Sequence, residues 1–383
     1  MKAPAFPVAS NAAALRKSIR VVLSAAALLT LCILCLLYRT DAADGVRTGI
    51  YTCLNALVPS LFPFILLACL LSKSDAARLL FRPLSPVMRH VFRLPPCAAS
   101  ALVFGLTAGY PTGAKITAQL YADRRLTRGQ AARLMCFCTA PGYAFAAAYT
   151  GTIMLGSAHT GLLLFLACVL APLLTGFCLA RFAGTPEKGA VPETSSGGGL
   201  TRAVQDGVSA MVSMCGFVVV FSAMLSVLHG SGLFQRLSGL LARCGMTVPD
   251  AGAAVSFLLE VTSGVSHSAY WHTAPILVAF GLGFGGVCIH LQIFSFFRSI
   301  DFPMRKSLYF LSRLLNGLTA ALCYRALAFF FPAAESAAVS GKTLSYAPST
   351  GSAAASAALL ALSVFFLLTC TKKNRPPKTG RRF

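Results

Sequence analysis

The chain has 383 residues, of which 56% are hydrophobic and only 11% are charged, and its formal net charge is +22. This composition is too apolar for a soluble domain of that length, so it excludes a soluble enzyme and indicates a protein surrounded by lipid. The cations do not indicate nucleic-acid binding, because most of the 33 Lys and Arg residues lie in short segments between apolar stretches. This positive-inside pattern predicts an all-α polytopic membrane protein with both termini in the cytoplasm.

Residues 1–48 are expected to form a cytoplasmic arm and the first transmembrane helix, over Val21–Tyr38. A helix needs about 20 apolar residues to cross the hydrocarbon core, and this stretch approaches that length. Basic residues precede it and Ala42 and Ala43 follow it, so it could instead be the apolar region of a secretory signal. The sequence leaves that alternative open.

Residues 49–183 are predicted to form a first repeat with a re-entrant hairpin. The hairpin segment, Cys97–Leu120, begins and ends beside basic loops and is interrupted by Gly109, Pro111 and Gly113. A segment of this kind enters and leaves the membrane on one face, and its non-helical backbone must be shielded from lipid. The predicted spans of this repeat are Gly49–Leu71, Leu134–Leu155 and Gly161–Ala180.

A linker rich in Gly and Ser, residues 184–200, separates this repeat from a second one, residues 201–332. The second repeat contains an amphipathic stretch, Leu233–Cys244, and a hairpin segment, Gly252–Ala269. Its predicted spans are Ala203–Leu228, Trp271–Phe297 and Ser307–Phe331. Residues 333–383 add a loop, a last span over Ala353–Cys370 and a basic cytoplasmic tail. We therefore expect about eight transmembrane helices and two re-entrant hairpins.

Short matches at nearly one offset favour an internal duplication. Leu80–Ser85 aligns with Leu233–Ser238, and Leu106–Gly109 aligns with Val261–Gly264. The first copy begins with a helix that runs inward and the second with a helix that runs outward, so the predicted repeat is inverted. Secondary transporters of this plan bind solutes near the midplane, where broken helices meet. The expected function is therefore the transport of a small solute.

Ionisable side chains at membrane depth are costly and mark candidate functional positions. Glu260 is the one acidic residue predicted inside an apolar segment. It could couple transport to a proton or cation, contact the ligand, or pair with a base in packing. Lys115 follows the first hairpin break and could attract an anionic solute, pair with Glu260 or extend to the lipid interface. Arg313 and Arg325 are predicted near the ends of one span, from which they would reach the interface.

Two further helices are predicted to be broken, at Thr139–Gly142 and at Gly281–Gly286, although glycines there could serve close packing alone. His290 and Gln292, after the second break, could line a path or form a hydrogen bond between helices. His267 and His272 are predicted to be solvated beside an outer turn. The whole predicted pathway for solute and ion comprises Lys115, Glu260, Thr107, Gly109, Tyr110, Pro111, Gly113, Thr139, Pro141, Gly142, Thr262, Ser263, Gly264, Gly283, Gly285, Gly286, His290 and Gln292.

Two other classes of function are weighed against transport. A membrane hydrolase is one, but no Ser, His and Asp arrangement or pair of carboxylates indicates catalysis, so no enzyme is expected. A non-transporting scaffold is the other, although it has no need of broken hairpins. The cysteine spacings fit neither a zinc site nor a redox motif, so no metal and no cofactor are expected. The expected partners are a small-molecule solute, a coupling proton or cation and the lipid bilayer, without nucleic acid, and a homo-oligomer is left open.

Three stretches carry a resemblance to a known family: Gly109–Lys115 (GYPTGAK), Leu258–Gly264 (LLEVTSG), and Gly281–Gly286 with His290 and Gln292 after it. They resemble the YlbJ family of sporulation integral membrane proteins, which carry nucleoside-recognition, or Gate, domains. The resemblance runs from Val58 to Phe331, and GYPTGAK is its most specific part. It implies a cell-membrane protein, in a membrane around the developing spore, that moves dipicolinic acid or another small anion. A nucleoside-type transporter and a spore-envelope scaffold are the alternatives.

Overall fold

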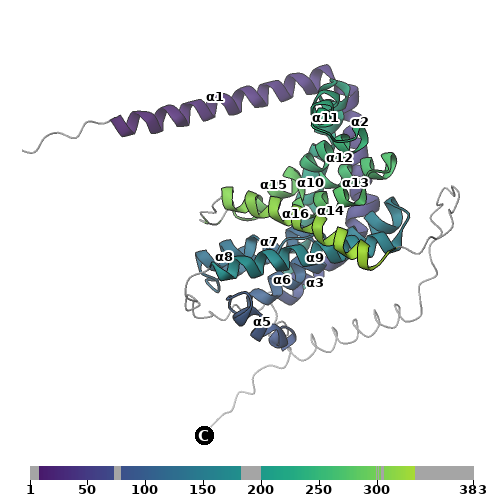
Figure 1. The fold of residues 1–383 in the computed structure, drawn as a ribbon. Helices are drawn as coiled ribbons and strands as arrows, with labels where there is room; N and C mark the ends of the chain where they lie inside the picture. The colour runs from purple at the N-terminus through teal and green to yellow at the C-terminus, as the bar shows by residue number, and fades with distance from the viewer. Residues whose placement is uncertain are drawn as a thin grey trace, which may run out of the picture. The chain divides into compact units, whose positions relative to one another are not determined.

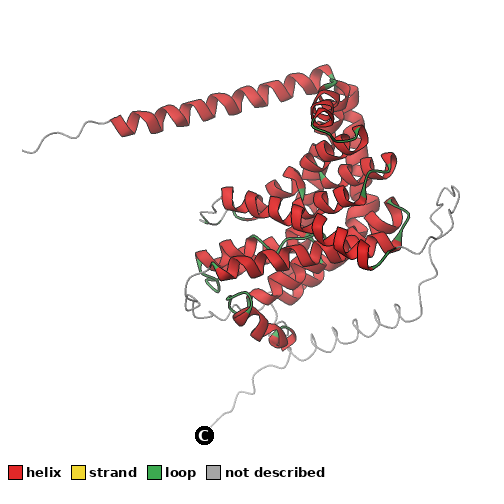
Figure 2. Ribbon diagram, in the orientation of Figure 1, coloured by secondary structure: helices red, strands yellow, loops and turns green. Residues whose placement is uncertain are grey.

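The computed structural model describes residues 8–72, 79–182, 200–298, 300, 302 and 306–332, and all regular structure in these residues is helical (Figure 2). Every described residue belongs to one unit, residues 1–333, while the second unit is residues 334–383. The last predicted span, the basic tail and the linker before Leu200 therefore lie outside the described residues. The all-α class is confirmed.

Four helices in the described part are long and apolar enough to cross a membrane: Arg39–Leu71, Ala158–Arg181, Ala203–Gly230 and Pro275–Phe296. Each coincides with a predicted span. The first begins earlier than predicted, because helical backbone starts at Arg39 and not at Gly49. The expected total of eight spans stays a prediction.

The first predicted repeat and the helix before it contain α1 (Val8–Leu37), α2 (Arg39–Thr52), η1 (Cys53–Leu57), α3 (Val58–Ser72), η2 (Arg82–Leu84), α5 (Ser85–His90), α6 (Ala98–Thr107), α7 (Tyr110–Ala122), α8 (Arg128–Met135), η3 (Ala144–Met154) and α9 (Ala158–Arg181). As predicted, α6 and α7 pack together as a hairpin. Its break lies at Ala108 and Gly109, and Gly109 has a φ of 111°, which residues with a side chain rarely adopt. Gly113, predicted as part of the break, lies inside α7.

The second predicted repeat contains α10 (Leu200–Gly230), α11 (Leu233–Arg243), α12 (Val248–Leu259), α13 (Val261–Trp271), α14 (Pro275–Phe284), α15 (Gly286–Phe296) and α16 (Lys306–Phe330). The hairpin of α12 and α13 turns at Glu260, whose backbone is extended. The break between α14 and α15 lies at Gly285, which is left-handed with a φ of 92°. The other predicted break, at Thr139–Gly142, is also present, because no helix covers these residues between α8 and η3.

The two groups of elements share one order: a long helix, a short helix, a hairpin, a broken helix and a final long helix (Figure 1). The helices that begin the groups, α2 with α3 and α10, pack against each other, and so do the final helices, α9 and α16. Gly45 permits the first contact, because a Cβ on it would lie 2.6 Å from the Cα of Ala223. This order agrees with a duplication, and the inverted orientation in a membrane stays a prediction.

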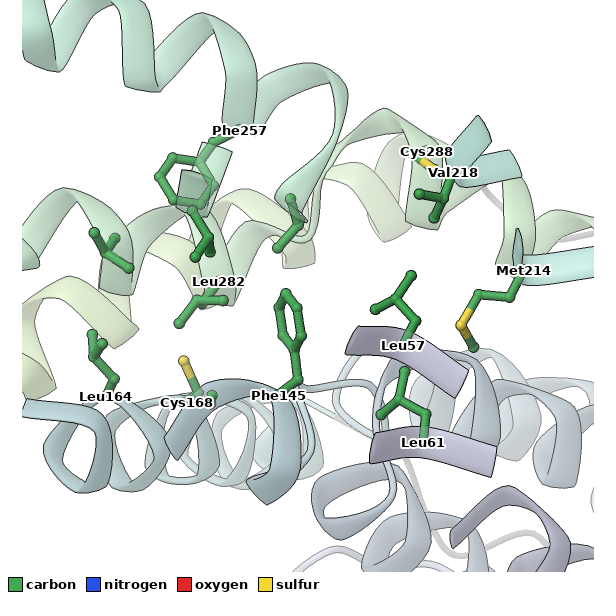
Figure 3. Close-up of a cluster of buried hydrophobic side chains, with 14 of the residues drawn as sticks. Leu57, Leu61, Phe145, Leu164, Cys168, Met214, Val218, Phe257, Leu282 and Cys288 are labelled. Carbon is green, nitrogen blue, oxygen red and sulfur yellow. The ribbon is translucent and has the colours of Figure 1, made fainter. Parts of the chain in front are cut away.

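A large hydrophobic cluster joins the two groups. Leu57, Leu61 and Phe145 from the first group pack in it with Met214 and Val218 of α10, and Figure 3 shows Met214 reaching toward the helix face that carries Leu57 and Leu61. The same cluster includes residues of α12, α14 and α15. These side chains surround the region in which the helix breaks meet.

Candidate functional site

The four helix breaks lie against one another in two pairs. A Cβ on Gly142, in the break between α8 and η3, would lie 2.6 Å from the carbonyl oxygen of Thr107 at the first hairpin break. A Cβ on Gly286 would lie 2.7 Å from the carbonyl oxygen of Phe257, near the second hairpin break. Tyr110 connects the pairs, because its hydroxyl group donates to the carbonyl oxygen of Leu282 at 2.5 Å.

A small cavity, here the central cavity, lies where the two hairpin breaks meet, and its volume is about 40 Å³. It has room for water but not for an organic solute. Apolar side chains such as Leu57, Leu61 and Phe145 form much of its wall. The cavity brings together seven residues of the predicted pathway: Gly109, Tyr110, Pro111, Gly142, Glu260, Thr262 and Gln292.

Glu260 is 2% exposed and forms the N-cap of α13. Its Oε1 accepts the backbone N–H of Thr262 at 2.8 Å, and its Oε2 accepts the backbone N–H of Ser263 at 2.6 Å and also the hydroxyl group of Thr262. These donors and the positive end of the helix dipole stabilise a carboxylate. Glu260 forms no ion pair with another residue in the described part of the chain.

Lys115 lies inside α7, beyond the hairpin break, and is partly buried. Its ammonium group donates to the main-chain carbonyl oxygen of Asp206 on α10. It does not line the central cavity, and the considered pairing with Glu260 is absent from the described contacts. The structure thus separates the two ionisable residues that the sequence singled out.

Arg313 corrects the sequence interpretation, because it is not at an interface but is 1% exposed. Its guanidinium group donates to the carbonyl oxygens of Thr139 at 2.7 Å and of Cys136 at 2.5 Å. Asn316 also donates to Cys136, at 3.0 Å, and accepts the hydroxyl group of Thr175 at 2.6 Å. Carbonyl groups freed by a broken helix need donors at membrane depth, so these residues hold the break after α8. The sequence did carry a signal for this role: Arg313 and Asn316 lie three residues apart on a predicted span, and so on one face of it.

Other predicted pathway residues lie outside the central cavity. Thr107 is exposed and bonds to its own helix, and His290 is buried with its Nδ1 at 3.3 Å from the hydroxyl oxygen of Tyr309. Thr139 and Pro141 are buried in the break that Arg313 holds, and Gly285 lies beside Tyr110. Three glycines serve close packing, because a Cβ on each would lie within 3 Å of a neighbouring atom: Gly113, Gly264 and Gly283.

A second and larger cavity, of about 280 Å³, lies among α2, α10, α12 and α13. We call it the hydroxyl-lined cavity, and its lining comprises Thr48, Thr52, Ser222, Leu225, Ser226, His229, Ser256, Thr262, Ser263, Ser266, His267, Tyr270 and Trp271. Sequence reasoning found only Thr262 and Ser263 of this set. His267 is half-buried in its wall, against the prediction of a solvated side chain, whereas His272 is exposed as predicted.

Arg313→Ala should destabilise the protein, because it leaves the Thr139 carbonyl without a donor and opens a cavity. Together these effects should cost about 3 kcal/mol or more. Arg325→Ala, on the exposed face of the same helix, should change stability by no more than about 0.5 kcal/mol. Thermal unfolding of both purified variants in one detergent measures the difference. Equal unfolding temperatures would contradict the role of Arg313.

The comparisons with known proteins point in the same direction as the motifs. No protein-family model and no solved structure matches the chain. The sporulation integral membrane protein YlbJ of Bacillus subtilis (strain 168) is 27% identical over 312 residues, which cover 73% of this chain and 76% of that protein. With the apolar helices, this similarity supports a membrane protein associated with sporulation. The chain is similar to YlbJ over most of its length, and the resemblance to the YlbJ family is confirmed.

Proposed function

We propose that this protein is a transporter of a small solute whose two hairpins open and close a path at the central cavity. The observation that carries the proposal is the meeting of both hairpin breaks and both broken helices around that cavity, with Glu260 in its wall. Transporters place interrupted helices near the midplane, where non-helical backbone is shielded by protein or lines a water-filled cavity. A scaffold would have no use for four breaks at one place.

The small volume of the central cavity indicates which elements must move during transport. Because it admits water but not an organic solute, the hairpins have to separate for a solute to pass. The hydrogen bond from Tyr110 to Leu282 connects the two groups of elements, so its loss would accompany opening. The solute that we propose, from the family resemblance, is dipicolinic acid or another small anion, moved across a membrane around the developing spore.

Glu260→Gln should reduce uptake at least about tenfold, because the amide cannot gain or lose charge and its NH₂ group would face the donors of α13. The measurement is uptake of dipicolinate, nucleosides and simple dicarboxylates by proteoliposomes. Asp44→Asn is the matched control, since that carboxylate is exposed and paired with Arg47, and it should retain uptake. Normal uptake by a stably folded Glu260→Gln variant would leave Glu260 the role of a helix cap alone.

Lys115→Met should weaken the affinity for an anionic solute, because an anion moved into a low-dielectric site needs a fixed cation or helix N-terminus. The bond to the Asp206 carbonyl must be released for Lys115 to serve that role. Uptake is measured against dipicolinate concentration, in protein that is verified to be folded. Arg325→Met, on an exposed position of α16, should change affinity little. Equal affinities of the wild type and Lys115→Met would favour a neutral, nucleoside-like solute.

A further inference from the structure

The two cavities meet at the start of α13. Glu260 lines the central cavity but not the hydroxyl-lined cavity, whereas Thr262 lines both. The hydroxyl group of Thr262 donates to Oε2 of Glu260. Thr262 is therefore the side chain that links the buried carboxylate to the larger cavity.

We propose that the ion coupled to transport is a proton, and that it reaches Glu260 from the hydroxyl-lined cavity through the hydroxyl group of Thr262. This inference rests on the proposed transport function and names its coupling ion and the route of that ion. Three features of the structure carry it: the cavity, the hydrogen bonds of the carboxylate and the lack of an ion-pair partner for it among the described residues.

The hydroxyl-lined cavity is suited to conduct protons. Its volume of about 280 Å³ has room for several water molecules. Most of its lining residues carry hydroxyl groups, which both donate and accept hydrogen bonds, and the neutral imidazoles of His229 and His267 each offer one donor and one acceptor. Tyr270 and Trp271 line it and are 73% and 53% exposed, so the cavity reaches the molecular surface.

The hydrogen bonds of Glu260 suit a proton better than a metal cation. A carboxylate offers about four lone-pair positions. Three already accept donors from Thr262 and Ser263, which leaves one position, on Oε1. A proton can move along the existing hydrogen bond from Thr262 to Oε2 and needs no free position, whereas hard metal cations need several oxygen ligands. Within the described part of the chain, no group of three His, Cys, Asp or Glu residues could hold a metal ion.

The groups around Glu260 do not compensate its charge. The titratable groups that act on it from neighbouring elements are Cys53 of η1, Tyr110 of α7, Tyr149 of η3 and Cys288 of α15. Thiol and phenol groups are ordinarily neutral at neutral pH. Within the described part of the chain, the buried carboxylate is therefore held by hydrogen-bond donors and not by an ion pair.

The transfer moves one proton and leaves no charge on Thr262. Oε2 of Glu260 takes the hydroxyl proton of Thr262, while a proton from cavity water replaces it on the same hydroxyl oxygen. Glu260 changes from a carboxylate to a neutral acid, and the cavity water loses one proton. The neutral acid is a weaker acceptor for the backbone N–H groups of Thr262 and Ser263. Protonation thereby loosens the cap of the second hairpin, which connects the proton to gate opening.

Infrared spectroscopy of the full chain in lipid vesicles tests the route without a solute. After a rapid drop in pH, the carbonyl stretch of a protonated carboxyl group is followed in time, and Glu260→Gln identifies the band of Glu260. Thr262→Val, which removes the hydroxyl group and keeps the shape, should slow the appearance of this band on the order of tenfold or more. Thr262→Ser should restore the wild-type rate. Ser238→Ala is the control and should keep the wild-type rate, because that hydroxyl group bonds to Gln235 of its own helix and lines neither cavity.

Three outcomes would overturn the inference. They are a band that grows in at the wild-type rate in Thr262→Val, a band that titrates differently when Na⁺ replaces choline at constant ionic strength, and the absence of any band that Glu260→Gln removes. No solute enters this measurement, so its failure would leave the transport proposal standing. Conversely, a protein that transports nothing would still show the Glu260 band if the route exists.

Discussion

The structure depends on one constraint: the backbone groups freed at a helix break must find partners inside the protein, because lipid offers none. A helix end frees carbonyl groups and a helix start frees N–H groups, and this protein provides a different side chain for each. Where α8 ends and carbonyl groups are freed, Arg313 and Asn316 donate to them. Where α13 begins and N–H groups are freed, Glu260 accepts them. Each side chain also carries the charge or polarity that complements its end of the helix dipole.

This arrangement gives the buried charges backbone partners in place of opposite charges. Arg313 and Glu260 are both almost completely buried, and neither forms an ion pair with another described residue. A change of charge on Glu260 therefore breaks no ion pair, and it acts on the start of α13 directly. A structural cap and a coupling group are then compatible roles for one carboxylate. The break held by Arg313 has no titratable acceptor, so we regard it as the rigid counterpart of the second hairpin.

The breaks could be predicted from the sequence because their signals are local. Gly109 needs a backbone conformation that favours glycine, and Glu260 interrupts an apolar run. What lies beside a break could not be predicted, because it depends on contacts distant in sequence. Arg313 was predicted at the lipid interface because it lies near the end of an apolar span. In the structure it is buried instead, because it donates to carbonyl groups of the break between α8 and η3. The hydroxyl-lined cavity could not be predicted for the same reason, since single Ser and Thr residues of four helices become a site only when those helices pack together.

The central claim is that the two groups of elements insert in opposite orientations, so that their hairpins meet from opposite faces of the membrane. Cysteine labelling tests it most directly, in a variant without the exposed native Cys32, Cys178 and Cys244. Val87→Cys on α5 and Gly239→Cys on α11 both lie at exposed positions. A membrane-impermeant maleimide should label Gly239→Cys from outside the cell and Val87→Cys only after the membrane is opened. Labelling of both positions from the same side would contradict the account.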